Sequence, residues 1–356
     1  MTLEELRAKI DAIDKEILRL LNERAQHAEG IGRIKRDANA VCYVPEREKL
    51  IFEALKSANT GPLPDKAILS IFREIISATR ALERPISVAY LGPADTFSHM
   101  AAMRIFGAMA DYHPITTVTD IFTEVERKRA DYGVVPVETS MGGGVSDTLD
   151  RFISSDLKIV NEVLLHISQN LLSNSPIEEV NKVYSKSQPF VQCRLWLRSN
   201  LPNAELIETR STAEAAQIAS NEPGAAAIAS DLAAETYGLR IVASSIEDAP
   251  HNFTRFFVIG RQMAKPTGHD KTSLLFAVKD KPGALYSLLQ PLAQRGINLT
   301  RIESRPSQRQ AWEYVFFVDL LGHAEEQEVE QAIDELTPHC SQLKILGSFP
   351  QGELQE

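Results

Sequence analysis

Three cations lie on one long amphipathic segment near the start of the sequence, at spacings that could hold a small anion. Arg24 and Lys35 are eleven residues apart, which on a helix separates them by about 20° around the axis and about 16 Å along it. Two side chains that lean toward each other over this distance could bind one small ligand from both ends. Arg7 lies 17 residues before Arg24, about 25 Å along the helix, so it would have to serve a site in a second subunit. The same charges would also fit the solvated face of an amphipathic helix.

A second set of polar residues stands at the start of a predicted strand, in "HNFTRFFVIG" at residues 251–260. Alternation along a strand places Thr254 and Phe256 on one face and Arg255 and Phe257 on the other. A hydroxyl in this position could simply cap the entry of the strand, because short motifs of this kind recur by accident. Its role therefore depends on the rest of the chain.

Composition limits the possible functions. The chain has 356 residues, 44% of them apolar, which is enough for two or three domains with packed cores. A net charge of −10 provides no broad basic field, so we expect no nucleic-acid partner. The three cysteines, Cys42, Cys193 and Cys340, are too few and too dispersed for a disulfide framework or a metal site. Because neither a signal peptide nor a stretch of about 20 apolar residues is present, we expect a cytoplasmic protein without a membrane partner.

The first cations belong to a predicted all-helical domain, residues 1–84. Apolar residues recur every three or four positions in "TLEELRAKIDAIDKEILRLLNERAQHAEGIGRIK", and Thr2 with Glu5 has the form of a capping box. Shorter helical patterns follow at 44–59 and 64–83. A first helix of about 50 Å is too long for one small domain and indicates packing between subunits.

Two further domains follow. Strands alternate with helices over residues 86–263, and we expect the chain to return to its starting sheet at 253–260, which fits an α/β fold of two lobes with a ligand cleft between them. Residues 271–350 show the order βαββαβ of an α+β, ferredoxin-like domain.

The helical region resembles the all-helical chorismate mutases, dimers of intertwined helices, through "LRAKIDAIDKEILRLLNER", "GRIK" and "PERE". A Claisen rearrangement needs no nucleophile, because cations hold the two carboxylates and a donor, here Lys35, stabilises charge on the ether oxygen. The family's second donor is a glutamine, whose position is occupied by Glu83, and a glutamate donates only when protonated. Thr79 replaces a serine and Val44 an aspartate. The resemblance implies that chorismate is bound by Arg24, Lys35, Arg47, Glu48, Thr79 and Glu83, with Arg7 of a second chain.

The middle region resembles prephenate dehydratases, which are two-lobed and periplasmic-binding-protein-like. It contains "YLGPADTFSH", "VVPVET", "VYSKSQPFVQC", "AAAIASDLAAETYGL" and "NFTRFF" in the family's order. The resemblance implies that Thr254 hydrogen-bonds or protonates the departing hydroxyl of prephenate, and that no metal or cofactor is required. The other implied substrate-binding residues are Glu138, Thr139, Ser185, Gln192, Asn252, Phe253, Arg255 and Phe256.

Three positions depart from the dehydratase pattern. Asp95 replaces a glycine, Thr139 an asparagine and Lys186 a histidine. A threonine offers one donor where an amide offers two, and a carboxylate facing a dianionic substrate would oppose its binding. An alternative function is therefore a non-catalytic regulator that binds prephenate or an amino acid in a degenerate cleft.

The C-terminal region resembles the ACT domains of prephenate dehydratases through "KPGALYSLL" and "IESRPS". The exposed N–H groups at a helix start favour a carboxylate, although these segments could also be a plain βα turn and the end of an edge strand. The implied phenylalanine pocket, at a domain interface, consists of Gly283, Ala284, Leu285, Glu303, Ser304, Arg305 and Pro306.

Together the three resemblances predict a bifunctional enzyme of phenylalanine biosynthesis. It would convert chorismate to prephenate and prephenate to phenylpyruvate, with feedback inhibition by L-phenylalanine. We expect a homodimer or a higher homo-oligomer.

Overall fold

The computed structural model describes residues 1–37, 43–140, 143–249, 252–278, 282–306 and 314–352. Two compact units emerge from the packing of the backbone. The first contains Met1–Ser87 together with Ile105–Asp111, and the second contains Val88–Arg104 together with Tyr112–Glu356.

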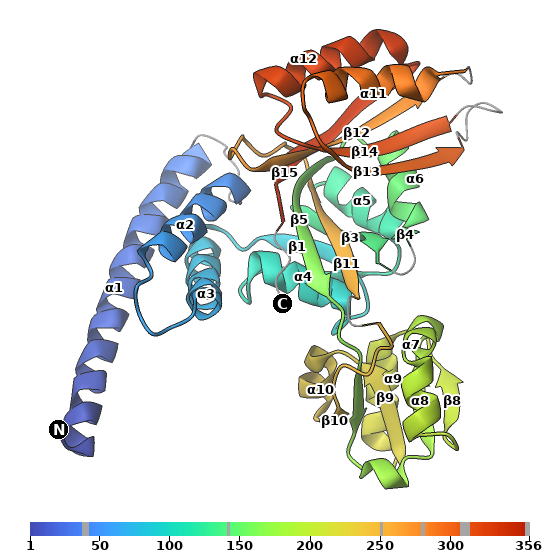
Figure 1. Cartoon of the computed structure of the whole chain (residues 1–356). Helices are drawn as coiled ribbons and strands as arrows, with labels where there is room; N and C mark the ends of the chain where they lie inside the picture. Colours follow the sequence, from blue (N-terminus) through green and yellow to red (C-terminus); the bar gives the residue numbers. More distant parts are fainter. Residues whose placement is uncertain (38–42, 141–142, 250–251, 279–281, 307–313, 353–356) are drawn as a thin grey trace. The chain divides into compact units, whose positions relative to one another are not determined.

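The first unit is built on three helices, as the sequence predicts. They are α1 (Leu3–Asp37), α2 (Pro45–Ala58) and α3 (Asp65–Glu83), and Figure 1 shows α2 and α3 beside the upper half of α1. The capping box is confirmed, because the Thr2 N–H donates to Glu5 Oε2 at 2.8 Å and the Glu5 N–H donates to Thr2 Oγ1 at 3.2 Å.

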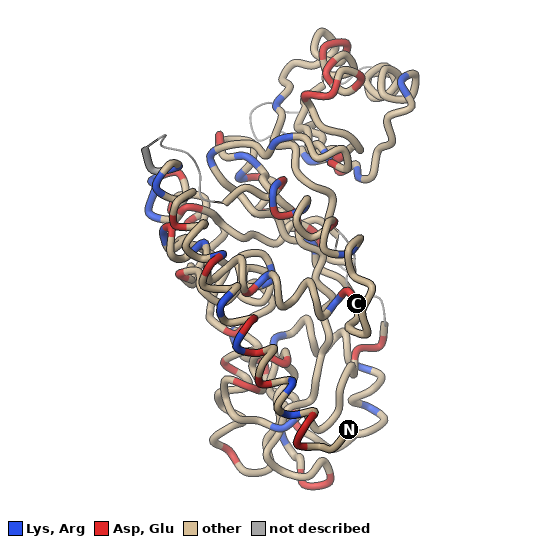
Figure 2. The backbone as a smooth tube through the Cα atoms, turned by 90° about the vertical axis from the view of Figure 1, so that its left-hand side faces the viewer, with Lys and Arg blue, Asp and Glu red and all other residues tan. Residues whose placement is uncertain are grey.

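The long helix α1 carries an apolar stripe that the single chain leaves exposed. Ile10 and Ile13 are 57% and 58% exposed, whereas a stripe of this kind normally faces a core. Figure 2 shows acidic and basic residues interleaved along the same helix. The exposed apolar residues of its first 20 positions include Leu3, Leu6, Ile10, Ile13, Ile17 and Leu20.

The first lobe of the second unit is a sheet flanked by helices. Its strand order is β2-β1-β3-β11-β5, and β4 pairs with β3. The strands are β1 (Ser87–Leu91), β2 (Asp111–Ile115), β3 (Tyr132–Thr139), β4 (Gly143–Gly144), β5 (Lys158–His166) and β11 (Phe253–Gly260). The helices are α4 (Phe97–Phe106), α5 (Val118–Glu126) and α6 (Ser146–Ser154).

The second lobe has its own sheet, with the order β10-β6-β9-β7-β8. Its strands are β6 (Asn170–Ser173), β7 (Lys182–Ser185), β8 (Glu205–Glu208), β9 (Ala225–Ala229) and β10 (Arg240–Ala243). Its helices are α7 (Ser187–Gln192), α8 (Arg194–Asn200), α9 (Thr212–Asn221) and α10 (Asp231–Tyr237). After this lobe, β11 pairs with β3 and β5 of the first sheet. The predicted return of the chain is therefore confirmed.

The C-terminal part has the ferredoxin-like order that the sequence predicts. It runs β12 (Asp270–Val278), α11 (Ala284–Gln294), β13 (Leu299–Pro306), β14 (Tyr314–Leu321), α12 (Gln327–Leu336) and β15 (Gln342–Pro350). The antiparallel sheet has the order β13-β14-β12-β15. On one face Phe276 packs against the helices through Leu288 and Ile333, as the position of α11 and α12 in Figure 1 indicates. On the other face Leu275 and Phe317 share a core with Phe257 of β11. The C-terminal sheet therefore packs directly on the first lobe.

Within the described ranges, no helix is long and apolar enough to cross a membrane. The same part of the chain brings together no group of three or more His, Cys, Asp or Glu side chains that could hold a metal ion.

Candidate functional sites

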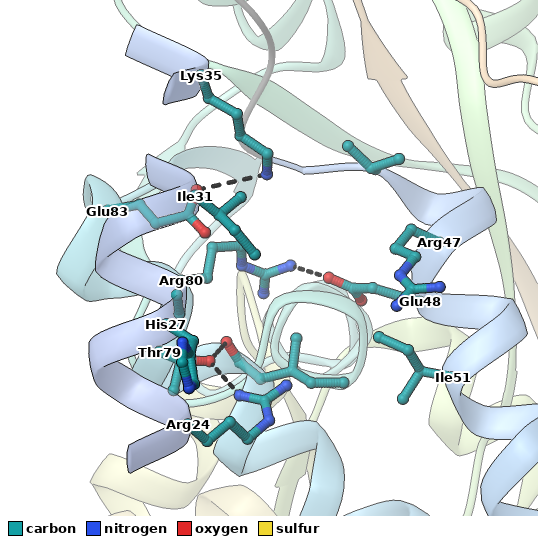
Figure 3. A pocket seen from close by; sticks show the side chains of 13 residues that line it. Arg24, His27, Ile31, Lys35, Arg47, Glu48, Ile51, Thr79, Arg80 and Glu83 are labelled. Carbon is teal, nitrogen blue, oxygen red and sulfur yellow. Dashed lines mark hydrogen bonds and ion pairs between the residues drawn. The ribbon is translucent and has the colours of Figure 1, made fainter. Parts of the chain in front are cut away.

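A cavity of about 470 Å³ lies among the three helices of the first unit. Figure 3 shows side chains from all three helices pointing into it. The predicted residues around it are Arg24, Lys35, Arg47, Glu48, Thr79 and Glu83, and the remaining lining comes from His27, Ala28, Ile31, Val44, Ile51, Ile76 and Arg80. Arg7 is exposed on α1 and does not line this cavity. The helical fold therefore gathers six of the seven predicted residues in one place.

Two cations hold fixed positions along the α1 side of the cavity. Arg24 Nη1 donates to Thr79 Oγ1 at 2.7 Å, and this hydroxyl donates in turn to the Ile75 carbonyl at 2.9 Å. Lys35 Nζ lies 3.4 Å from Glu83 Oε2. Burial lowers the pKa of Arg24 from its ordinary value, but a guanidinium remains charged at neutral pH. The cavity thus offers two separated positive groups.

Gly32 allows α1 to approach α3 at this point. A Cβ atom at Gly32 would lie 2.8 Å from Glu83 Cγ, closer than side-chain carbons pack. The glycine of the "GRIK" motif therefore helps to place Glu83 beside Lys35.

Glu48 is a second largely buried carboxylate of the cavity, in addition to Glu83. Burial raises its pKa, and this effect is opposed by the charges of Arg80, Arg73 and Lys35. Arg80 Nη1 lies 2.5 Å from Glu48 Oε1. Arg80 was not predicted from the sequence, although it stands four residues after Ile76 and three before Glu83, on the same helix face.

The second candidate site is centred on the pairing of β3 with β11. Thr254 stands directly opposite Thr139, and Arg255 stands opposite Glu138. Because successive side chains point to opposite faces of a sheet, the two threonines share one face and the charged pair lies on the other. The candidate catalytic hydroxyl therefore has a second hydroxyl residue beside it.

The charged face of this strand pair lies against the C-terminal sheet. Arg255 is buried and pairs with Glu162 of β5, with Nε 2.7 Å from Oε2, and with Asp319 of β14. Burial disfavours the charged form of Arg255, but Asp319 and Glu162 outweigh it and raise the pKa of the guanidinium. Glu138 Oε2 lies 3.3 Å from Arg301 Nε of β13. The sequence assigned Glu138 and Arg255 to substrate binding, whereas the fold does not bring them to the face of Thr254.

A chain of buried amides lies where the backbone passes between the two lobes. Gln192 Nε2 donates to Asn252 Oδ1 at 3.5 Å, and Gln192 Oε1 accepts from Gln169 Nε2 at 3.0 Å. Asn252 Nδ2 donates to the Ile167 carbonyl at 3.3 Å. Ser185 lies apart from this chain. Its buried hydroxyl donates to the Ile228 carbonyl at 2.9 Å, inside the second lobe. Gln169 was not predicted, and no motif marked it.

The aromatic residues beside Thr254 have different surroundings. The Phe253 N–H donates to Ser140 Oγ at 3.0 Å, and its ring lies edge-on to His166 at 5.1 Å between centroids. Phe256 is buried within the lobe. Phe256 therefore has a core position, while Phe253 is only partly covered.

Two of the three residues that depart from the dehydratase pattern, Asp95 and Lys186, lie in surroundings that the structure describes. Asp95 has a φ of 63°, a left-handed conformation that favours glycine, which accounts for the glycine at this position in the family. Its carboxylate lies 3.8 Å from His99 Nδ1. Lys186 is exposed at the N-cap of α7.

A second cavity, of about 630 Å³, is lined by both lobes. The first lobe contributes Gly92, Pro93 and Ala94 from the "YLGPADTFSH" motif, and the second contributes residues that include Arg210 and Glu214. None of the predicted dehydratase residues lines this cavity. The cavity therefore adjoins the motif that contains Asp95 and, through Tyr237, the motif "AAAIASDLAAETYGL".

The predicted phenylalanine residues fall into two groups. Gly283, with a φ of 78°, is the N-cap of α11, and Ala284 and Leu285 begin this helix. Along β13, Glu303 pairs with Arg301, and Arg305 Nε lies 3.2 Å from Asp150 of α6. Lys281 and Ser307 of the two motifs lie outside the described residues.

The remaining residues of the β13 motif differ in exposure from Glu303. Ser304 and Pro306 are exposed, whereas the Glu303 carboxylate lies so close to Gly144 that a Cβ atom there would collide with it. Two of the predicted residues on β13, Glu303 and Arg305, therefore contact the first lobe of the same chain.

Comparison with known proteins identifies all three parts. Family models match residues 6–84 (chorismate mutase type II), 88–264 (prephenate dehydratase) and 272–337 (ACT domain). A bifunctional chorismate mutase/prephenate dehydratase of Aquifex aeolicus is 55% identical over 359 residues, covering 99% of each chain. A protein of the same name from Neisseria gonorrhoeae is 45% identical, covering 98% of each chain.

A solved structure agrees with this comparison. The prephenate dehydratase of Arthrobacter aurescens in complex with L-Phe is 34% identical, with a TM-score of 0.69 over 75% of this chain and 90% of that one. Relatives this similar over the full length, with all three family models in one chain, show that the protein belongs to the bifunctional chorismate mutase/prephenate dehydratase family.

Proposed function

We propose that the helical cavity rearranges chorismate to prephenate, that the β3–β11 face converts prephenate to phenylpyruvate, and that L-phenylalanine inhibits the enzyme through its ACT domain. The observation that carries this proposal is the gathering of six predicted residues around one cavity of about 470 Å³. A volume of this size suits a small organic acid. The family membership of the whole chain supports the same order of reactions.

The mutase reaction requires only binding and electrostatic stabilisation. Arg24 and Lys35 would hold the substrate's carboxylate and ether oxygen, and so keep the two reacting carbons close to each other. During the rearrangement the C–O bond breaks as the new C–C bond forms, and negative charge grows on the ether oxygen. A donor fixed beside this oxygen lowers the barrier, because it needs no reorganisation during the reaction. Lys35 would be this donor, and Glu83 would assist it only when protonated.

We propose that Arg7 completes the cavity of a second subunit in a homodimer. The exposed apolar stripe of α1 supports this arrangement, because burying residues such as Ile10 and Ile13 requires a partner surface. The distance of about 25 Å between Arg7 and Arg24 along one helix supports it independently.

The dehydratase reaction would use the Thr254 hydroxyl. The C–C bond to the departing carboxylate breaks, its electron pair enters the ring, and the C4–O bond breaks, so that carbon dioxide and hydroxide leave together. A hydrogen bond from Thr254 to the departing oxygen would stabilise its growing charge. Thr139, directly opposite Thr254, would supply the contact that an asparagine makes in other family members.

Inhibition by phenylalanine would reach this face through charged contacts. Glu303, in the predicted effector motif, pairs with Arg301, which contacts Glu138 on the strand that carries Thr139. A ligand that draws Glu303 away from Arg301 would change the charge that faces Glu138. We therefore assign Glu138 and Arg255 to the coupling of the ACT domain with the active site.

We also propose the domain boundaries 1–84, 86–263 and 271–350, together with a cytoplasmic location. The family models, which start at residues 6, 88 and 272, support the boundaries. Cys193 and Cys340 are free thiols, which supports a reducing compartment.

The test is direct. Purified protein is incubated with chorismate, and both prephenate and phenylpyruvate are followed with and without L-phenylalanine. We expect phenylpyruvate to form and phenylalanine to slow its formation. Accumulation of prephenate alone would contradict the second activity, and the absence of any turnover would favour the non-catalytic regulator.

A further inference from the structure

The chain segment Ile105–Asp111 packs with the mutase helices, although it follows them in the sequence and lies within the range of the dehydratase model. Its backbone forms hydrogen bonds with two side chains of α3. Ser77 Oγ donates to the Phe106 carbonyl at 2.8 Å, and the Met109 N–H donates to Ser77 Oγ at 3.1 Å. The Ala108 N–H donates to Glu74 Oε2 at 3.0 Å. These three hydrogen bonds help to fix the segment on α3 of the mutase unit.

Gly107 is required for this close approach. It has a φ of 70°, in the left-handed region where residues with a side chain are strained. A Cβ atom at Gly107 would also collide with the side chain of Ser77. The segment can pack on α3 in this way only because this position is a glycine.

The segment also holds a charged side chain that lines the mutase cavity. Arg80 Nη2 donates to the Phe106 carbonyl at 2.6 Å, while Arg80 Nη1 lies 2.5 Å from Glu48 Oε1. The guanidinium carbon lies 5.3 Å from the centre of the Tyr43 ring and 5.7 Å from that of the Phe106 ring. Figure 3 shows Arg80 extending across the cavity toward Glu48. One planar group is thus fixed between the segment and the predicted substrate-binding carboxylate.

We propose that Arg80 is a positioning residue of the mutase site, which orients Glu48, and that Ile105–Asp111 is the support that holds Arg80 in place. The mutase site would then depend, within each chain, on a segment that lies beyond its own three helices. This inference rests on the proposed mutase function. It adds to that site one residue, Arg80, and one later segment, Ile105–Asp111, neither of which the sequence indicated.

The positioning role of Arg80 can be measured through the pH dependence of mutase activity, because charged groups surround Glu48. Glu48 is faced by Arg80 and Arg73 of α3 and by Lys35 of α1, and the same cavity also contains Arg24, His27, Arg47 and Glu83. Burial raises the pKa of Glu48, and Arg80 is the foremost charge that opposes this rise. If ionised Glu48 binds the substrate, activity rises with pH as Glu48 loses its proton. Removal of Arg80 should move this rising limb to higher pH.

The experiment compares mutase pH profiles of the full chain, with chorismate as substrate. We expect Arg80→Gln to lower kcat/KM about 10- to 100-fold near neutral pH, the range found when outer-shell residues that orient metal ligands are removed. The loss should shrink as the pH rises toward 9. Gly107→Ala, which changes no residue of the cavity, should shift the limb in the same direction by a smaller amount. Met109→Ala is the matched control, because it removes an exposed side chain and keeps the N–H that bonds to Ser77. It should leave the profile unchanged.

The helical content of the same samples, measured by circular dichroism, reports whether the mutase helices of each variant are folded. If Arg80→Gln does not fold, Arg80→Lys replaces it, since it keeps the charge but cannot contact Glu48 and Phe106 through one planar group. A loss that is equal at every pH would overturn the positioning role. An unchanged profile in folded Gly107→Ala would overturn the supporting role of the segment. These two outcomes can be told apart from a failure of the proposed function, because in that case the parent protein itself would lack mutase activity.

Discussion

The contact between Lys35 and Glu83 leads to a prediction about the pH dependence of the mutase. A carboxylate at this position accepts hydrogen bonds and donates only when protonated. At the observed separation of 3.4 Å between Lys35 Nζ and Glu83 Oε2, attraction between the two charges amounts to about 5 kcal/mol at an effective dielectric constant of about 20. Ionised Glu83 therefore draws Lys35 away from the ether oxygen and repels the carboxylates of the substrate.

Glu83→Gln removes this attraction and supplies an amide donor at every pH. A hydrogen bond to a charged group contributes about 1.5–3 kcal/mol, which corresponds to an increase of about 10- to 100-fold in kcat at neutral or alkaline pH. In the parent enzyme the Glu83 carboxylate accepts a hydrogen bond from Lys35, whereas the amide of the variant can donate to the ether oxygen, so the variant should be the more active at neutral and alkaline pH.

The assay follows the disappearance of chorismate between pH 5 and 9 for the parent, for Glu83→Gln and for Glu53→Gln. Glu53 is an exposed carboxylate of α2 outside the cavity, so its substitution controls for the change in net charge. An unchanged pH profile in Glu83→Gln would refute the reasoning, because it would mean that Glu83 does not act on the reacting oxygen.

Two further predictions concern assembly and regulation. When Arg7→Ala protein is mixed with Arg24→Ala protein under conditions of subunit exchange, some mutase activity should return, because one cavity of each heterodimer retains both arginines; no recovery despite verified exchange would argue against a shared site. Arg301→Gln, which removes the ion pairs of Arg301 with Glu303 and with Glu138, should weaken inhibition by phenylalanine at least several-fold while dehydratase turnover without phenylalanine stays within about threefold of the parent. Unaltered inhibition in that variant would exclude this route of coupling.

Local sequence patterns predicted the elements well. The three helices of the mutase unit were predictable because their apolar residues repeat at helical spacing, and the capping box of Thr2 and Glu5 was predictable because it involves residues only three positions apart. The return of β11 to the first sheet followed from the order of strands and helices. These features depend on neighbouring residues in the chain.

Contacts between distant segments were harder to foresee. Alternation separated Arg255 from Thr254, but it does not reveal that the C-terminal sheet covers the face of Arg255 through Asp319. The role of Arg80 depends on Phe106, 26 residues later, and nothing in the pattern of α3 indicates this contact. Side chains that bind a substrate and side chains that bind another domain have the same chemistry, so the sequence alone could not distinguish them.

The central claim is that one chain carries two separate active sites that act in series, and Thr254→Ala tests it most directly. Parent and variant are given chorismate, and prephenate and phenylpyruvate are measured over time in each sample. The variant should form prephenate at nearly the parental rate and accumulate it, with phenylpyruvate formation reduced at least about 100-fold, as expected for loss of a group that stabilises the departing oxygen. Thr254→Ser, which keeps the hydroxyl, should retain part of the dehydratase activity. Phenylpyruvate formation at the parental rate in folded Thr254→Ala would contradict the account.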